Sequence, residues 1–173
     1  MWVRLNQRGS GVDYVRLELA ESGPNRNVFF HADSSVDLVA LPFLPDRDKF
    51  EFKLLPEQMV TEKDEPERLN IREGTEVFFT GLLVQYAGVQ RNHPVVRFGR
   101  VALVTDEPIE FQGERRDVYL LEVASFGGNS GAPVFFSLGA DREPGMLVIG
   151  APIVKLAGVM MGMTCPPTLV QAL

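Results

Sequence analysis

The chain is poor in the residues that build disulfides and metal centres. It contains one cysteine, Cys165, and two histidines, His31 and His93, among 173 residues. A single cysteine excludes a disulfide within the chain and is typical of proteins in a reducing compartment. No cluster of cysteine and histidine has the spacing of zinc ligands, so we expect neither a metal nor another cofactor. Cys165 stands in MGMTCPPT without a base beside it, which favours a structural role over a nucleophilic one.

Positive charge and long apolar runs are also scarce. The chain has 17 lysines and arginines against 23 aspartates and glutamates, a formal net charge of −6. This balance argues against nucleic acid as a partner, because such binding depends on neutralising phosphates. No segment approaches the roughly 20 apolar residues that span a bilayer, and the N-terminus MWVRLNQRGSGVDYV lacks the pattern of a signal peptide. We therefore expect a cytoplasmic protein that binds neither nucleic acid nor membrane.

Short strand signals fill most of the chain. VDYVRLEL (12–19) and KFEFKL (49–54) alternate apolar and polar residues with period two. Helix signals are weak: residues 56–72 hold the best candidate, and Pro66 limits it to at most two short turns. Other apolar runs, bounded by turn residues, cover 27–30, 37–43, 75–84, 95–105, 117–124, 132–138, 146–150 and 155–162. The pattern predicts an all-β barrel or sandwich.

One stretch, SFGGNSGAPVFF (125–136), carries a candidate nucleophile. An attacking serine needs an exposed hydroxyl, a base that takes its proton, and donors for the oxyanion. Gly127, Gly128 and Gly131 surround Ser130, and glycines allow the sharp backbone turn that meets the first and third needs. A serine in a glycine-rich turn is also common in ordinary loops, so the turn alone leaves both interpretations open.

The segment GGNSGAP resembles the nucleophile loop of trypsin-like serine peptidases of the chymotrypsin fold, in particular the bacterial HtrA-like type with GNSG. The match covers residues 128–133 except for Ala132, which stands in place of a common glycine. The resemblance implies that Ser130 is the nucleophile and that the backbone N–H groups of Gly128 and Ser130 form the oxyanion hole. Asn129 stands where the secreted enzymes carry aspartate, so we expect no maturation through a freed N-terminus.

Three further stretches resemble the same family, and together with the serine loop they follow its order over residues 28–163. SSVDLVALPF resembles the segment with the triad aspartate, which implies that Asp37 orients the base. GTEVFFTGLLVQYAG and VVRFGRVALV resemble the first two strands of the second barrel. KLAGVMMGM resembles the late strand beside the specificity pocket, which implies that Gly158 and Met160 belong to that pocket.

The floor of the implied pocket falls on Ala124, six residues before Ser130. No acidic residue stands there to attract lysine or arginine. The resemblance therefore implies a preference for an apolar or small side chain before the scissile bond.

The histidine of the triad has no counterpart at the family's position. The family order is His, Asp, Ser, with the histidine about 45 residues before the aspartate. Counted from Asp37, that position lies upstream of Met1. His31 lies six residues before Asp37, and His93 stands in an expected loop of the second barrel. Because geometry rather than order defines a triad, both stay open as bases.

The resemblance implies a chymotrypsin-like double β-barrel, with an incomplete first barrel in residues 1–55, a connection in 56–72 and a second barrel in 73–173. Missing strands leave open edges, so residues 1–45 should be the least stable region or should pair with a partner chain. The expected function is a serine endopeptidase domain that acts on polypeptides through an acyl-enzyme on Ser130, weakly or not at all without its base. The alternatives are a non-catalytic module that binds an extended peptide, and an unrelated β-fold in which GGNSGAP is only a turn.

Overall fold

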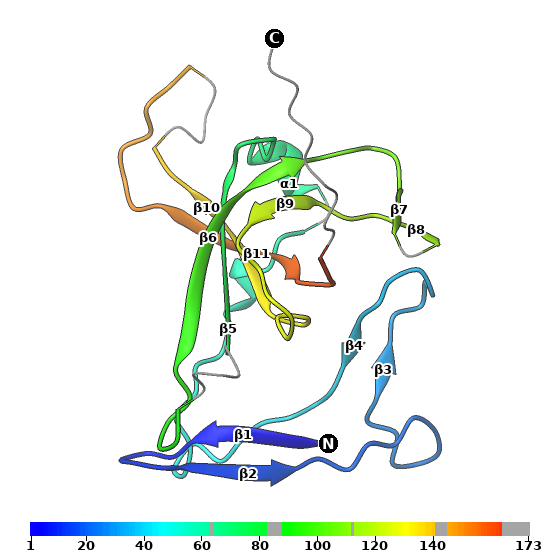
Figure 1. Ribbon diagram of the computed structural model, residues 1–173, viewed down its shortest axis with the longest axis vertical. Helices are drawn as coiled ribbons and strands as arrows, with labels where there is room; N and C mark the ends of the chain where they lie inside the picture. Colours follow the sequence, from blue (N-terminus) through cyan, green and yellow to red (C-terminus); the bar gives the residue numbers. More distant parts are fainter. Residues whose placement is uncertain (63, 83–87, 112, 141–144, 164–173) are drawn as a thin grey trace.

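Five antiparallel strands form the main sheet of the protein (Figure 1). The computed structural model describes residues 1–62, 64–82, 88–111, 113–140 and 145–163. Cys165 and the predicted strand end at 83–84 lie outside the described residues. The strands of the sheet, in the order β11-β10-β5-β6-β9, are Ile153–Val159, Pro133–Leu138, Glu76–Leu82, Pro94–Leu103 and Leu120–Val123.

The strand order is that of a Greek key. β5, β6 and β9 follow one another as antiparallel neighbours, and β10 returns to pair with the other side of β5. A fourth strand beside the first defines this motif, which occurs in antiparallel barrels and in sandwiches. β11 extends the sheet beyond β10. Within the described ranges the sheet is open, with β9 and β11 as its edges.

Three two-stranded hairpins surround the sheet. β1 (Trp2–Asn6) pairs with β2 (Val12–Arg16), and β3 (Phe29–Phe30) with β4 (Val39–Ala40). β7 (Ile109–Phe111) pairs with β8 (Glu114–Arg116) inside the connection from β6 to β9. The only helical segments in the described ranges are η1 (Glu57–Met59) and α1 (Glu65–Arg68), as the position of Pro66 predicts. The prediction of an all-β fold is therefore confirmed.

One face of the sheet forms the hydrophobic core. Burial along β5 and β10 alternates with period two, as expected for strands with one covered face. Phe79 and Phe136 are the largest side chains that solvent hardly reaches, at 0% and 1% exposure. Ile71, from the connection, and Met160, just after β11, complete the cluster. Burying the two phenylalanines fixes which residues of β5 and β10 face inward.

The opposite face of the sheet carries aromatic side chains. Phe78 of β5 stacks on Phe135 of β10 with ring centroids 5.0 Å apart, and lies 6.1 Å from the ring of Phe98 on β6. Phe98 is 75% exposed. Cross-strand aromatic contacts of this kind stabilise the pairing of neighbouring strands without closing a second core.

The connection between the N-terminal hairpins and the sheet runs along the outer edge of β11. Val60 forms a parallel bridge with Leu156, and the Thr61 N–H donates to the Leu156 carbonyl at 3.1 Å. The backbone of β11 at Leu156 is therefore already paired on both sides.

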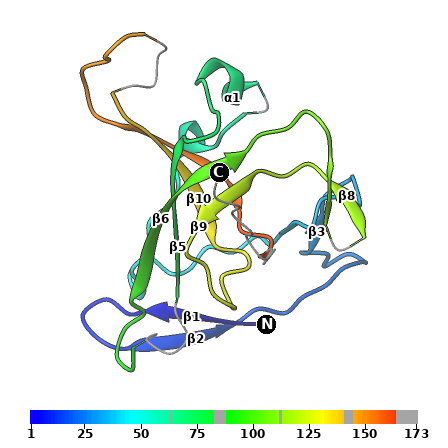
Figure 2. The same cartoon turned by 45° about the horizontal axis from the view of Figure 1, so that its top comes forward.

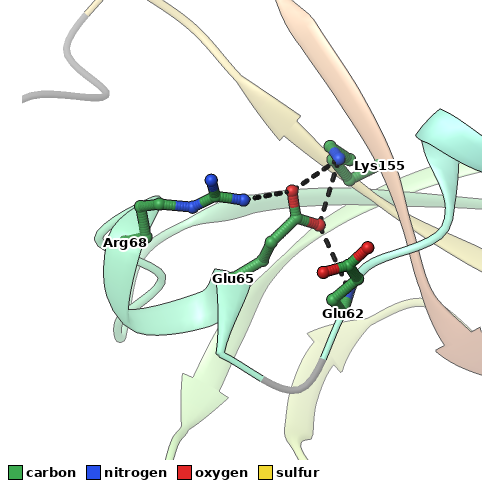
Figure 3. Close-up of polar contacts among 4 residues, drawn as sticks. All are labelled: Glu62, Glu65, Arg68 and Lys155. Carbon is green, nitrogen blue, oxygen red and sulfur yellow. Dashed lines mark hydrogen bonds and ion pairs between the residues drawn. The ribbon is translucent and has the colours of Figure 1, made fainter.

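A buried carboxylate fastens α1 to β11 (Figure 3). Glu65 is 6% exposed and accepts hydrogen bonds from the Lys155 ammonium at 2.7 and 3.0 Å and from Arg68 at 2.8 Å. The Glu62 N–H donates to the same carboxylate at 3.1 Å. The hydrogen bond from Lys155, followed by that from Glu62, lowers the pKa of Glu65 below its ordinary value. The connection is thus held by charge as well as by backbone pairing.

The β1–β2 hairpin is anchored to residues far along the chain. Arg4 donates to the Asn92 side chain at 2.6 Å and to the Gly88 carbonyl at 2.6 Å. Asn92 in turn donates from its backbone to the Asn6 side chain at 2.6 Å and from its amide group to the Arg4 carbonyl at 3.0 Å. The start of the chain is therefore hydrogen-bonded to another part of the protein. The expectation that residues 1–45 are the least stable region or pair with a partner chain stays a prediction.

Two predicted strands do not form. In KFEFKL only Phe50 makes a bridge, to Gln7, and residues 51–56 have no regular structure. In MLVIG, residues 147–149 are irregular and exposed or half-buried. Alternation or apolar character predicts a strand only where a neighbouring strand offers backbone partners. The domain boundaries at residues 55 and 73 remain predictions.

Candidate functional site

The candidate serine lies in the connection from β9 to β10, which is the long crossover of the Greek key (Figure 1). Gly128 and Gly131 flank it with φ angles of +95° and +80°. These angles favour glycine, because a Cβ atom in the left-handed region meets the neighbouring carbonyl. A Cβ atom at Gly131 would touch nothing else within 4 Å. Backbone conformation, rather than lack of space, therefore requires this glycine.

Hydrogen bonds fix this loop against the residue that follows β11. The Gly131 N–H donates to the Met160 carbonyl at 2.7 Å, and the Met160 N–H donates to the Ala132 carbonyl at 2.8 Å. Asn129 is 4% exposed, and its side-chain amide donates to the Ser125 hydroxyl at 3.1 Å. Two backbone hydrogen bonds to Met160 and one hydrogen bond within the loop therefore hold the backbone on either side of Ser130 in place.

Ser130 itself is exposed on this loop. Its hydroxyl donates to the Met161 carbonyl at 3.0 Å. A peptide carbonyl is a neutral acceptor that does not take the proton, so this contact holds the side chain without activating it. In the described part of the chain, the N–H groups of Gly128 and Ser130 have no protein acceptor. The loop therefore presents a reachable hydroxyl together with free backbone donors.

Asp37 and His31 lie in the turn between β3 and β4, and both are exposed. His31 makes its polar side-chain contact within this turn, where its Nδ1 accepts from the Asp33 N–H at 3.1 Å. The Asp33 carboxylate accepts from the backbone and hydroxyl of Ser35 at 2.9 and 2.8 Å. These two hydrogen bonds lower the pKa of Asp33. Among the described contacts neither His31 nor Asp37 meets Ser130.

Arg116 of β8 joins this turn to the serine loop. Its Nη1 donates to the Ser35 carbonyl at 2.9 Å and lies 3.9 Å from the sulfur of Met161. Met161 is the residue whose carbonyl accepts from Ser130. Figures 1 and 2 both show the β3–β4 hairpin beside β8. The structure thus brings the Asp37 turn and the Ser130 loop to one side of the protein, through an arginine that no sequence motif marked.

His93 lies in a different setting, directly before β6, and is exposed. Its ring covers Gly88, since a Cβ atom there would fall 2.7 Å from the His93 Cδ2 atom. The neighbouring Asn92 binds the β1–β2 hairpin. His93 therefore lies beside the segment that binds the N-terminal hairpin, and no described contact links it to Ser130.

The three predicted pocket residues have different surroundings. Ala124 and Gly158 are exposed, at the end of β9 and in β11 respectively. The Met160 side chain is 9% exposed and packs in the hydrophobic core. The Met160 backbone holds the serine loop in place. The pocket roles of Ala124, Gly158 and Met160 stay predictions.

A second arginine, also missed by sequence reasoning, lies beneath the serine loop. Arg97 of β6 is 7% exposed, and its guanidinium lies 5.5 Å from the ring of Phe79 and 5.5 Å from that of Phe126. Its Nη1 and Nη2 atoms are buried and make no hydrogen bond in the structure. Sequence alone offers one weak signal, a charged residue within the apolar run VVRFGRVALV.

Searches of the described ranges find no metal site and no membrane helix. No group of three or more histidine, cysteine, aspartate or glutamate side chains there could hold a metal ion. No helix of these ranges is long and apolar enough to cross a bilayer.

Comparisons with known proteins identify no family for this chain. Neither family models, nor curated proteins, nor solved structures give a match. The trypsin-like resemblance rests on the motifs quoted above, and the function has to be argued from the site.

Proposed function

We propose that this chain is a trypsin-like serine peptidase domain that binds an extended polypeptide and whose nucleophile, Ser130, lacks a general base in the resting structure. The observation that carries the proposal is the setting of Ser130: an exposed hydroxyl between two glycines of positive φ, on a loop fixed to Met160. An ordinary turn needs neither free backbone donors nor this fixation.

The arrangement of strands supports the same proposal. The serine loop is the Greek-key crossover. It leads directly into β10, and Met160, the residue after β11, is hydrogen-bonded to it. In this proposal the five-stranded sheet is the counterpart of the second barrel of a chymotrypsin-like protein, and the β1–β2 and β3–β4 hairpins are the counterpart of strands of the first. In this proposal Asp37 occupies the position of the triad aspartate. Arg116 connects its turn to Met161, the residue that accepts the hydrogen bond from Ser130.

The chemistry of the proposed site follows from its donors and acceptors. Ser130 Oγ attacks a peptide carbonyl carbon, and the free N–H groups of Gly128 and Ser130 stabilise the negative charge on the carbonyl oxygen. The proton of Oγ has to leave and reach the departing amine as the C–N bond breaks, and the Met161 carbonyl cannot carry it. Water then hydrolyses the acyl-enzyme. Without a base, oxyanion donors and binding alone still give roughly 10³–10⁴ over the uncatalysed rate.

A fluorophosphonate probe tests whether Ser130 is a nucleophile. We expect slow labelling of the wild-type chain that disappears in Ser130→Ala and persists in His31→Ala and His93→Ala. Ser10→Ala is the matched control, because Ser10 is an exposed serine of the β1–β2 turn and should leave labelling in place. Labelling equal in wild type and Ser130→Ala would refute the nucleophile. Fast labelling that is lost in His31→Ala or His93→Ala would refute the missing base.

A second candidate function is a purely peptide-binding module. The observation that favours it is the hydrogen bond from Ser130 to a backbone carbonyl, which gives the hydroxyl a structural role. This alternative predicts that Ser130→Ala binds fluorescent peptides as well as wild type does, and that prolonged incubation yields no cleaved peptide by mass spectrometry. Slow cleavage that depends on Ser130 would decide for the peptidase.

A further inference from the structure

Arg97 is a buried cation without a counter-ion among the described residues. It is 7% exposed, and neither Nη1 nor Nη2 meets an acceptor. A guanidinium keeps its charge in proteins, so it cannot escape the cost of burial by losing a proton. The rings of Phe79 and Phe126, both 5.5 Å away, offset part of this cost through cation–π contacts. The two Nη atoms remain as a pair of unused, parallel donors.

The unused donors lie directly under the loop that carries Ser130. In the β6–β9 ladder Gly99 pairs with Val123, so Arg97 lies two residues further toward Ser125 and Phe126. The Phe126 side chain is 57% exposed although one face of it covers the guanidinium. Phe126 is not part of the buried core cluster. A half-exposed ring outside the core is the group whose rotation would uncover Arg97 without displacing the core.

A paired donor set in an apolar surrounding is suited to a planar anion. A guanidinium binds a carboxylate through two parallel hydrogen bonds, and a site that already lacks water loses little when the anion enters. The loop above also carries two polar side chains, Asn129 and Ser125, which are joined by their own hydrogen bond. No carboxylate of the described residues is paired with Arg97. The missing partner has the chemistry of a carboxylate brought by a ligand.

We infer that Arg97 forms a subsite for an acidic side chain of the bound polypeptide, with Phe126 as the ring that covers it in the unliganded protein. The identification of the ligand as a polypeptide rests on the proposed function, whereas the anion site itself rests on Arg97. The inference reverses the preference for apolar or small side chains that Ala124 alone implied. In this inference a cation of β6, covered by the serine loop, sets the specificity; β6 is the sheet neighbour of β9, which Ala124 directly follows.

Peptide binding tests this subsite without requiring hydrolysis. The probes are fluorescein-labelled pentapeptides with an amidated C-terminus, Ala-Ala-Glu-Ala-Ala and its Gln counterpart, measured by fluorescence anisotropy on the Ser130→Ala chain. We expect the Glu peptide to bind at least about tenfold more tightly, because hydrogen bonds to charged groups are worth at least one such factor. Arg97→Met should abolish this difference, and Phe126→Ala should increase the affinity for the Glu peptide. Arg100→Met, on the same strand with its side chain 65% exposed, is the matched control and should keep the difference.

Additional arms separate the possible sources of the carboxylate. A Gln peptide with a free C-terminus that binds as tightly as the Glu peptide would assign the site to a terminal carboxylate and overturn the side-chain inference. The inference would also be overturned if the Ser130→Ala chain, which keeps Arg97, bound the Glu and Gln peptides with equal affinity. It would be overturned as well if the preference for the Glu peptide survived in Arg97→Met.

A spectroscopic readout covers the case in which Arg97→Met does not fold. In the folded chain, N-acetyl-glutamate amide should shift the NMR signal of the Arg97 side chain, and N-acetyl-glutamine amide should not. No shift with either compound would refute the subsite. Fluorophosphonate labelling of Ser130 is independent of both measurements, so labelling without Glu discrimination refutes only the subsite. Glu discrimination without labelling refutes only the nucleophile.

Discussion

Replacing Arg97 by methionine should make the protein more stable, although it removes a buried side chain of β6. Each buried donor group left without an acceptor costs about 1–3 kcal/mol, so the two Nη groups together cost about 2–6 kcal/mol. The contacts with Phe79 and Phe126 give back about 0.5–2 kcal/mol each. Methionine keeps the apolar stem and contacts with both rings. The difference between the middle values of these two ranges predicts that Arg97→Met has a free energy of unfolding about 1–2 kcal/mol higher than that of the wild type.

Urea denaturation followed by circular dichroism measures this change, and thermal unfolding should show a rise in Tm of roughly 3–6 °C for a chain of this size. Arg100→Met is the control: its side chain is 65% exposed and lies 3.8 Å from Glu76 across the ladder. An exposed ion pair contributes little, so this variant should stay within about 0.5 kcal/mol of wild type. If Arg97→Met is less stable than Arg100→Met, the guanidinium is satisfied in the folded protein and the reasoning fails.

Three further predictions concern the core, the serine loop and the connection. Phe136→Ala should lower the free energy of unfolding by about 3–5 kcal/mol in urea titrations, because the ring is 1% exposed; a loss below about 1 kcal/mol would contradict its place in the core. Gly131→Ala should cost about 1–2 kcal/mol through its φ of +80° and should slow labelling of Ser130, whereas Gly127→Ala, on negative or extended backbone with open space around it, should change labelling little. Glu65 has a lowered pKa in the folded state, so its contribution is complete above its ordinary value of 4.5 and is lost as the pH falls through the lowered value. Stability measured from pH 7 to pH 3 should therefore fall less steeply in Glu65→Gln than in wild type, and parallel curves would show that the contact with Lys155 does not matter.

Local sequence patterns predict the inner sheet well, because strand period and burial agree there. β5 and β10 place every second residue in the core, as their apolar alternation requires. The pattern in KFEFKL is as clear, yet only Phe50 finds a backbone partner. A strand needs a neighbour as well as a period, and the neighbour is a property of the whole fold.

The candidate site, too, is predictable from the sequence only in part. The glycines around Ser130 predict positive φ angles, and Gly128 and Gly131 adopt them. The surroundings of His31 could not be predicted, because the Asp33 turn that holds it forms through Ser35 rather than through Asp37. The bond from Arg116 to Ser35 joins residues 81 positions apart, a separation at which a single sequence carries no signal.

The burial of Arg97 follows from the register of β6. In VVRFGRVALV each face of the strand carries one arginine: Arg97 shares its face with Gly99 and Val101, and Arg100 shares the other with Phe98. The structure turns the first face inward, with Phe98 75% exposed and Arg97 7% exposed. Gly99 explains the choice. A Cβ atom at Gly99 would fall 2.3 Å from the Glu122 carbonyl oxygen and 2.7 Å from the Val123 Cβ, so only glycine fits where β6 meets β9 on the inner face.

Once Gly99 and Val101 face inward, the two-residue period of the strand turns Arg97 inward as well. Its position is thus set by the backbone and not by a flexible side chain that has folded under the loop. A register that buries a cation is costly, but a one-residue slip would not relieve this cost, because it would expose Val101 and bury Arg100 in place of Arg97. The fold therefore holds beneath the serine loop a guanidinium that has no acceptor in the described ranges, and a ligand that carries a carboxylate is the partner that would lower its energy.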